Sequence, residues 1–506
     1  RIAYERFERE FKLGPRILVY FHGPEVFRAP FLREAEALSA ALERLKGMRS
    51  VFSAVDLLEP EARGATVMLR RVLRPEVVDD PARLAAALGT TPFANHWQKL
   101  LYDKDLRVFC MILTPELDDS DPAVTLAFMG QVEELVAGAS ARSGVPVHLG
   151  GMFYMNQEVL RVTLEDGNRL TAIGLALDFL LVWALFGSFR LALFVDLILG
   201  MGVYFGFAAM ALAGIPVNFM SSNFSVTLLV LGTTDLVHLI GTFASNRARY
   251  GSRGAALRAT RRTLWPNFFC SFTTWAAVLV TAWTDLKILR EFSLSISLAV
   301  FIIFPLAMIY GPLLFMRSGI EPGRGLFFRL EARLWAVVRG PCLRSIASPW
   351  PKLAFWGLTA AALAITGMQE VNSNWFRYFT ADMPVSRTQD FLARHGFPVA
   401  VVDCTLDTGR EIEEVLADAG LRADVERIAG AIRGLPGVVE VYHLYTQKAY
   451  MDAEWVSVAL PPGLAPEWIE ARRQSMERDF LMRGAFDDYF SPLSGRLRIA
   501  VLTSLE

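Results

Sequence analysis

Long apolar segments dominate the middle of the chain. Five of them lie between residues 170 and 315, and a sixth follows a basic stretch. Each is close to the length of about 20 residues that a helix needs to cross a bilayer. The pattern therefore predicts a bundle of membrane helices. The predicted spans are Leu170–Gly187, Leu191–Ala213, Phe219–Phe243, Pro266–Trp283, Phe292–Phe315 and Lys352–Met368.

Residues 1–150 show a different pattern, in which short apolar runs alternate with segments of helical period. Strand–helix–strand, given twice, predicts a ferredoxin-like α/β domain with its helices on one face of a sheet. Residues 151–169 form a polar connecting helix. The predicted strands are Ile17–Phe21, Val51–Leu58, Arg107–Thr114 and Pro146–Leu149, and the predicted helices are Leu32–Leu45 and Ala123–Ala137.

Residues 371–506 are again soluble in character and contain a repeat. A helix, a glycine turn and a strand entry recur 390 positions further on, and the strand end Leu113–Thr114 has a counterpart in Leu502–Thr503. A duplicated unit of soluble domain and membrane bundle is typical of transporters. We then expect the chain to be incomplete at both ends. The matched positions are Leu38, Leu42, Leu45, Gly47 and Val51 with Ile428, Ile432, Leu435, Gly437 and Val441.

Charge predicts how the bundle is oriented. The chain is 53% hydrophobic and has a net charge of −1, so it lacks the global basic field of a nucleic-acid-binding protein. The basic residues instead concentrate in two connections: residues 244–265 carry six arginines and no acidic residue, and residues 317–352 are also basic. The positive-inside rule makes these connections cytoplasmic and places residues 1–169 and those after about 370 on the other side.

These patterns divide the chain into six parts. They are a first extracytoplasmic α/β domain (1–150), a connecting helix (151–169), a five-helix membrane bundle (170–316), a cytoplasmic basic linker (317–351), a membrane helix (352–370) and a second, incomplete extracytoplasmic α/β domain (371–506). The excess of arginine over lysine is typical of a GC-rich bacterial genome, so we expect a multi-pass inner-membrane protein with large periplasmic domains. The four cysteines form no close-spaced pair and indicate neither a disulfide framework nor a zinc site.

The third apolar span contains the candidate chemistry. Asp235 lies near its middle, where a carboxylate costs roughly 2.5–3.5 kcal/mol, so a functional role is the default interpretation. His238 follows at the i+3 position, and Thr234 precedes the acid. We predict a proton relay of Asp235, His238 and Thr234, although a threonine in such a helix more often bonds its own backbone. Asp178, midway along the first span, is a second candidate carboxylate.

Two further features of the spans have structural interpretations. Asp196 lies near a helix end and is interpreted as interfacial, and Gly200, Gly202 and Gly206 are interpreted as a close helix-packing face.

Five motifs follow one another in the membrane region: Gly214–Asn218, Gly232–Leu239, Ala255–Trp265, Ser271–Thr274 and Leu289–Phe292. In their order and spacing they resemble the resistance–nodulation–division (RND) superfamily, in particular its lipid-exporting branch and the related sterol-sensing-domain proteins. The resemblance implies twelve membrane helices in two pseudo-symmetric halves, of which the second to seventh are visible, while the first and the last five are absent. It also implies export driven by proton influx, with the relay acid of the fourth helix at Asp235.

The resemblance favours an exporter of a hydrophobic lipid such as a sterol or hopanoid. It would use the proton motive force and no cofactor, contact membrane lipids and a periplasmic acceptor protein, and work as a homo-oligomer or a pseudo-symmetric monomer. Two alternatives remain: a lipid-binding sterol-sensing scaffold without transport, and a protein-secretion accessory. No nucleophile–base pair, metal cluster or phosphate loop stands at a persuasive spacing, so we predict neither an enzyme nor a metal site.

Overall fold

The computed structural model describes most of the chain and divides it into two compact units. One unit combines Arg1–Glu158 with Asn374–Glu506, and the other is Val159–Ser373. The described residues are 7, 10–11, 15–63, 66–90, 97–98, 100–117, 121–218, 220, 223–318, 326, 330, 333–340, 348–367, 379–449 and 487–504.

The first domain is built on a four-stranded antiparallel sheet with the order β2-β5-β1-β6. Two helices, α2 and α6, each link a pair of these strands, which gives the predicted ferredoxin-like topology. The elements are β1 (Ile17–His22), α2 (Ala29–Glu43), β2 (Met48–Ser53), β5 (Val108–Pro115), α6 (Pro122–Ser143) and β6 (Val147–Gly150).

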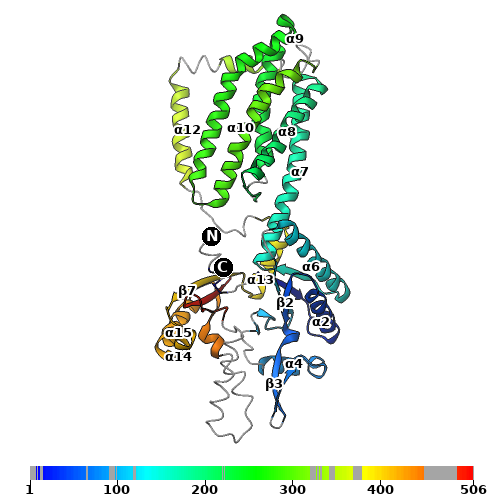
Figure 1. Ribbon diagram of the computed structural model, residues 1–506, viewed down its shortest axis with the longest axis vertical. Coiled ribbons are helices and arrows are strands. Elements are labelled where there is room, and N and C mark those ends of the chain that lie inside the picture. Colours follow the sequence, from blue (N-terminus) through cyan, green and yellow to red (C-terminus); the bar gives the residue numbers. More distant parts are fainter. Residues whose placement is uncertain are drawn as a thin grey trace. The chain divides into compact units, whose positions relative to one another are not determined.

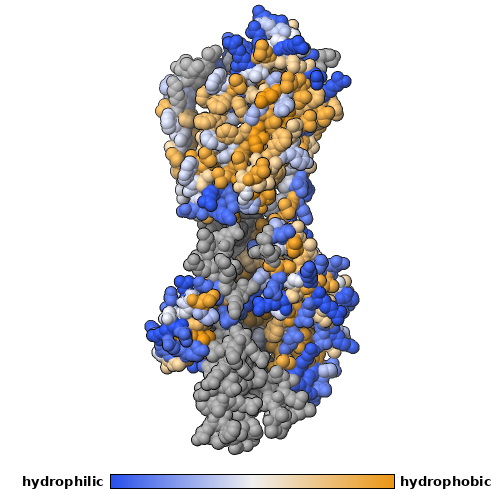
Figure 2. Space-filling view, viewed as in Figure 1, coloured by the Kyte–Doolittle hydropathy of each residue, from blue (hydrophilic) through white to orange (hydrophobic). Residues whose placement is uncertain are grey.

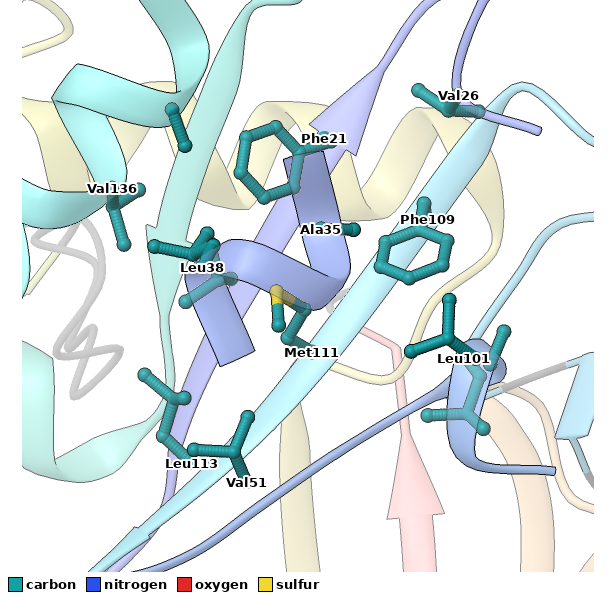
Figure 3. Close-up of a cluster of buried hydrophobic side chains, with 14 of the residues drawn as sticks. Phe21, Val26, Ala35, Leu38, Val51, Leu101, Phe109, Met111, Leu113 and Val136 are labelled. Carbon is teal, nitrogen blue, oxygen red and sulfur yellow. The ribbon is translucent and has the colours of Figure 1, made fainter. Parts of the chain in front are cut away.

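The core of this domain lies between one face of the sheet and the two helices (Figure 3). Strand alternation sends Val19 and Phe21 to this face, where they meet Leu38 of α2 and Val136 of α6. Tyr20 and its alternate neighbours point to the opposite face of the sheet and belong to a separate apolar cluster.

One predicted strand is wrong in extent. Val51–Leu58 was expected to be continuous, but β2 ends at Ser53 and a 3₁₀ turn, η1 (Ala54–Asp56), follows. The turn forms because the Asp56 carboxylate accepts hydrogen bonds from the Ser53 backbone N–H (2.9 Å) and hydroxyl (3.0 Å), which caps it locally. The chain then leaves the main sheet as a separate hairpin of β3 (Leu58–Arg63) and β4 (Thr66–Arg71), followed by α3 (Pro75–Val78) and α4 (Pro81–Thr90).

The second soluble part has a sheet of order β7-β10-β8. In chain order this is first–third–second, the same path that β1, β5 and β2 follow in the first domain. The elements are α13 (Pro384–His395), β7 (Ala400–Asp407), α14 (Ile412–Ala417), α15 (Ala419–Arg433), β8 (Val438–His443), β9 (Phe490–Ser491) and β10 (Arg496–Thr503).

The predicted repeat is present in backbone detail. Gly47 and Gly437 both have positive φ, of 97° and 79°. Two residues later in each copy, Arg49 and Val439 are skipped in the pairing of β2 with β5 and of β8 with β10, so the same bulge occurs 390 positions apart. The duplicated architecture is therefore confirmed.

The matched strand ends, however, were predicted one residue out of register. Ser50 pairs with Thr114 and Glu440 with Leu502, so Thr114 corresponds to Leu502 and not to Thr503. Six consecutive residues of β10 are buried, so its sequence lacks the alternation that would have fixed the register.

Among its described residues, the membrane unit has four helices that are long and apolar enough to cross a membrane, together with a shorter apolar helix. Helices α7 to α10 lie side by side (Figure 1), and apolar side chains predominate on the face of the bundle that Figure 2 shows. The described helices are α7 (Met152–Phe186), α8 (Phe189–Leu212), α9 (Phe224–Val280), α10 (Lys287–Phe315) and α12 (Trp350–Thr366), with a 3₁₀ turn η3 (Thr281–Trp283) after α9.

Two predicted spans are joined in α9. Gly251 has φ 66° and ψ 178°, which breaks the helix into segments 224–250 and 252–280. These correspond to the predicted spans Phe219–Phe243 and Pro266–Trp283, and the basic connection between them is helical on both sides of Gly251. The polar helix predicted over residues 151–169 is likewise continuous with the first span, as α7.

Candidate functional site

Asp235 lies on segment 224–250 of α9 and is only 3% exposed. Its Oδ2 accepts a hydrogen bond of 3.0 Å from the Ser271 hydroxyl, and its backbone carbonyl accepts one of 3.0 Å from the Asn267 side-chain amide. Both donors lie on segment 252–280. In the described part of the chain, no lysine or arginine forms an ion pair with Asp235. Asp235 therefore joins two membrane segments through two neutral donors, Ser271 to its carboxylate and Asn267 to its backbone carbonyl.

Asp178 of α7 contacts segment 224–250 on the side opposite to Asp235. Its Oδ1 lies 2.7 Å from the Thr233 hydroxyl, which also lies 2.8 Å from the carbonyl oxygen of Leu229. The Thr233 hydroxyl has one proton, so it can serve only one of these two acceptors fully. The contact connects α7 to α9 inside the bundle.

Two carboxylate oxygens close to this contact lack partners. Oδ2 of Asp178 and Oδ1 of Asp196 are buried and make no hydrogen bond within the described residues. The interfacial interpretation of Asp196 does not account for a buried oxygen of this kind. Buried polar atoms normally have partners, so each of these oxygens has an unmet requirement for a proton, a cation or a donor.

The structure does not bring His238 or Thr234 to the Asp235 carboxyl group. Both are exposed on the described surface of the bundle, and the Thr234 hydroxyl donates to the carbonyl of Val230, 2.9 Å away. The i+3 spacing leaves a rotation of about 60° between Asp235 and His238. This is enough to move a side chain from a buried seam to an exposed face. Their relay roles remain predictions.

Close helix packing holds segment 224–250 in place. A Cβ atom built on Gly232 would lie 2.5 Å from Leu199 Cδ2 and 2.8 Å from Ile303 Cγ1. One built on Gly202 of α8 would lie 2.4 Å from Ile303 Cδ1. The side chain of Ile303 thus fills a space that exists only because both positions are glycine. A Cβ atom on Gly206 would lie 2.6 Å from Phe224 Cζ, whereas one on Gly200 would meet no neighbouring side chain of the described residues within 4 Å, so the predicted packing face excludes Gly200.

Sequence reasoning missed the partners of the acids. Asn267 is 2% exposed and was not singled out, although an asparagine in an apolar span is itself a signal. Ser271 was noted only as part of a motif. The partnership of Thr233 with Asp178 was not visible because it joins residues 55 positions apart.

The described residues contain no group of three or more His, Cys, Asp or Glu side chains placed to hold a metal ion. Cys110, Cys270 and Cys404 are free thiols.

Comparison with known proteins gives a family match. The model of the MMPL family matches residues 33–341. Two structures titled as X-ray crystal structures of a heavy metal efflux pump are similar to this chain. Crystal form I is 14% identical, with a TM-score of 0.39, covering 97% of this chain and 46% of that one. Crystal form II is 15% identical, with a TM-score of 0.35, and the match covers 60% of this chain and 35% of that one. This chain thus spans less than half the length of either pump. No curated protein matches it.

Proposed function

This chain belongs to the MMPL family of RND-type membrane proteins, and we propose that it is a proton-driven exporter of a hydrophobic lipid. The family match confirms the predicted resemblance to the superfamily and supports transport in general. The more specific parts of the proposal are the proton drive, the lipid cargo, and a bacterial inner-membrane location with the soluble domains in the periplasm.

The observation that carries the proposal is the environment of Asp235. A carboxylate in a membrane bundle is normally paired with a cation or hydrated, since the isolated charge is costly. Asp235 instead has a serine hydroxyl as its side-chain partner among the described residues. A neutral donor stabilises the ionised form less than a cation would, so both protonation states of the group are accessible. This is the property that a proton carrier requires.

The contacts also suggest how a proton would change the bundle. The ionised Asp235 carboxylate can accept the Ser271 hydrogen bond and attracts water. The protonated group is neutral and can instead donate a hydrogen bond. Because it attracts less water, segments 224–250 and 252–280 can then pack against each other with less water between them. Coupling requires that the two forms favour different arrangements of these segments. Alternation between them would drive movement that the soluble domains use to hand on cargo.

The choice of a sterol- or hopanoid-like lipid follows from the branch of the superfamily that the motifs resemble. A lipid from the outer leaflet would pass to a periplasmic acceptor protein, with the exporter working as a homo-oligomer or as a pseudo-symmetric monomer. No cofactor enters this scheme, because the proton gradient supplies the free energy.

The test is export of a fluorescent sterol from reconstituted lipid vesicles with an imposed pH gradient. We expect Asp235→Asn to abolish gradient-driven export, because asparagine keeps the hydrogen-bonding shape but cannot be ionised. Asp166→Asn is the matched control, since Asp166 is an exposed acid on α7. Full gradient-driven export by Asp235→Asn would refute the proton-carrier role. Sterol binding that no variant and no gradient alters would favour the lipid-binding scaffold instead.

A further inference from the structure

The second face of the first sheet is covered by a helix from the far end of the sequence. Tyr20 of β1 and Cys110 of β5 point to this face, where they form a buried apolar cluster with Phe391 and Leu392 of α13. Gly150 of β6 lies close to the same helix, because a Cβ atom there would lie 3.3 Å from Thr388 Cγ2. Helix α13 is therefore docked on strands β1 and β6.

Three of the six histidines of the chain gather at the edge of this contact. They are His22 at the end of β1, His148 on β6 and His395 at the end of α13, and we call them the histidine cluster. The Phe391 ring is at its centre: its centroid lies 4.5 Å from that of His148, in a stacked arrangement, 4.4 Å from that of His395 and 5.4 Å from that of His22. The rings of His22 and His395 are 4.8 Å apart.

The charged neighbours of the histidine cluster are mixed. The Asp103 carboxylate favours a proton on His22, and Arg107 disfavours it. Arg394 of α13 disfavours a proton on His148. Asp103 is already engaged, since its Oδ1 accepts hydrogen bonds from the backbone N–H groups of Arg107 (2.7 Å) and Val108 (2.9 Å).

The remaining polar groups at this contact do not supply a counter-charge. Burial raises the pKa of both Tyr20 and Cys110, so these two groups stay neutral. Asp390 and Arg387 of α13 are exposed to solvent.

We propose that the histidine cluster is a proton-binding site that controls the docking of α13 on the first sheet. With neutral rings, Phe391 and the three imidazoles pack together and α13 is held. Protonation places two or three like charges within one ring stack, next to two arginines and a single engaged carboxylate, so α13 is released. The site is separate from Asp235, and its function does not depend on the proposed export.

The direction of the effect follows from the contacts. Burial and the neighbouring histidines lower the pKa of His22 and of His148 in the docked arrangement. A histidine whose pKa is lower in the docked state binds more protons when α13 is released. Docking is therefore favoured above the ordinary histidine pKa of about 6.5 and is lost as the pH falls below it.

Hydrogen exchange of the whole protein in lipid vesicles tests this. After correction for the intrinsic pH dependence of exchange, we expect amides of α13 to exchange at least about tenfold faster at about pH 5.5 than at about pH 7.5. The triple variant H22Q, H148Q and H395Q should lose this difference, because glutamine stays neutral. Should it fail to fold, as judged by the protection of β5, the three single variants should each show a reduced difference.

A matched control is available in the second sheet. His443 is buried on β8 and does not belong to the histidine cluster, so His443→Gln should leave the pH response of α13 unchanged. Equal protection of α13 at both pH values in the unmodified protein would overturn the proposal. So would a pH response that persists in full without the three histidines. Loss of export in Asp235→Asn with an intact α13 response would leave this inference standing.

Discussion

The packing around Ile303 gives a prediction that can be worked out atom by atom. Replacing Gly232 with alanine puts a methyl group 2.8 Å from Ile303 Cγ1, which lies at the base of its side chain and cannot swing away. Overpacking of this kind costs about 1–3 kcal/mol. Replacing a glycine in a helix with alanine stabilises the helix by about 0.8–1 kcal/mol. We therefore expect a net destabilisation of about 0–2 kcal/mol for Gly232→Ala, toward the upper end because two side chains are met below 3 Å.

The same reasoning gives smaller effects at two glycines of α8. At Gly202 the new methyl group meets the far end of the same side chain, Ile303 Cδ1, at 2.4 Å, and a change of rotamer relieves part of the clash. We expect a net loss of about 0–1 kcal/mol there. Gly200→Ala is the matched control: nothing lies within 4 Å, so the helix should gain up to about 1 kcal/mol.

The assay is thermal unfolding in detergent, combined with a second substitution. Ile303→Val removes only Cδ1 and by itself costs about 0.5–1.5 kcal/mol. It should rescue most of the loss in Gly202→Ala, whose closest contact is Ile303 Cδ1, but not that in Gly232→Ala, which still meets Leu199 Cδ2 at 2.5 Å and Ile303 Cγ1 at 2.8 Å. Equal midpoints for Gly200→Ala and Gly202→Ala, or equal rescue of both tight positions, would refute the packing described for Ile303.

Three further predictions concern the soluble domains, and hydrogen exchange or denaturant unfolding can check each. The Asp403 carboxylate lies 2.7 Å from the Arg498 guanidinium, and both side chains are mostly buried, so Asp403→Ala should destabilise the second sheet by about 3–5 kcal/mol. Hydrogen-exchange protection of β10 equal to that of the unmodified protein would contradict this. Burial lowers the pKa of His443 to about 4, so the second sheet should lose stability as the pH falls from about 6.5 toward 4, and His443→Gln should remove that slope. Gly47→Ala and Gly437→Ala should each cost about 1–2 kcal/mol because both residues have positive φ; an unchanged midpoint would show that these turns tolerate a side chain.

Much of the fold could be predicted because local patterns determine it. The run predicted as Arg107–Thr114 is apolar from Val108 to Leu113 and corresponds to the inner strand β5, and the helical period of Ala123–Ala137 lies within α6. The errors occur where a single side chain outweighs the pattern. Asp56 ends β2 by capping the next turn, and the bulge at Val439 shifts the pairing of β10 by one residue. Neither effect changes the hydrophobic pattern along the chain.

The candidate site was only half predictable for a similar reason. Asp235 could be found because one acid in an apolar run is conspicuous. Its partner Ser271 lies 36 positions away, and only the packing of two helical segments brings them together. The histidine cluster is a stronger case: His22, His148 and His395 come from three distant segments, and each one alone is unremarkable in sequence.

Segment 224–250 is the element whose position a proton is best placed to change. Thr233 and Asp235 are two residues apart, so they point about 160° away from one another around the helix. One reaches Asp178 on α7, and the other joins Ser271 on segment 252–280. A charge gained or lost on either carboxyl group therefore acts on opposite sides of the same helix. The tight fit of Gly232 against Ile303 limits how that helix can respond, because sideways movement toward α10 is blocked. Segment 224–250 can still rotate about its axis or slide along it, and either movement changes the contacts of Asp178 and Asp235 together.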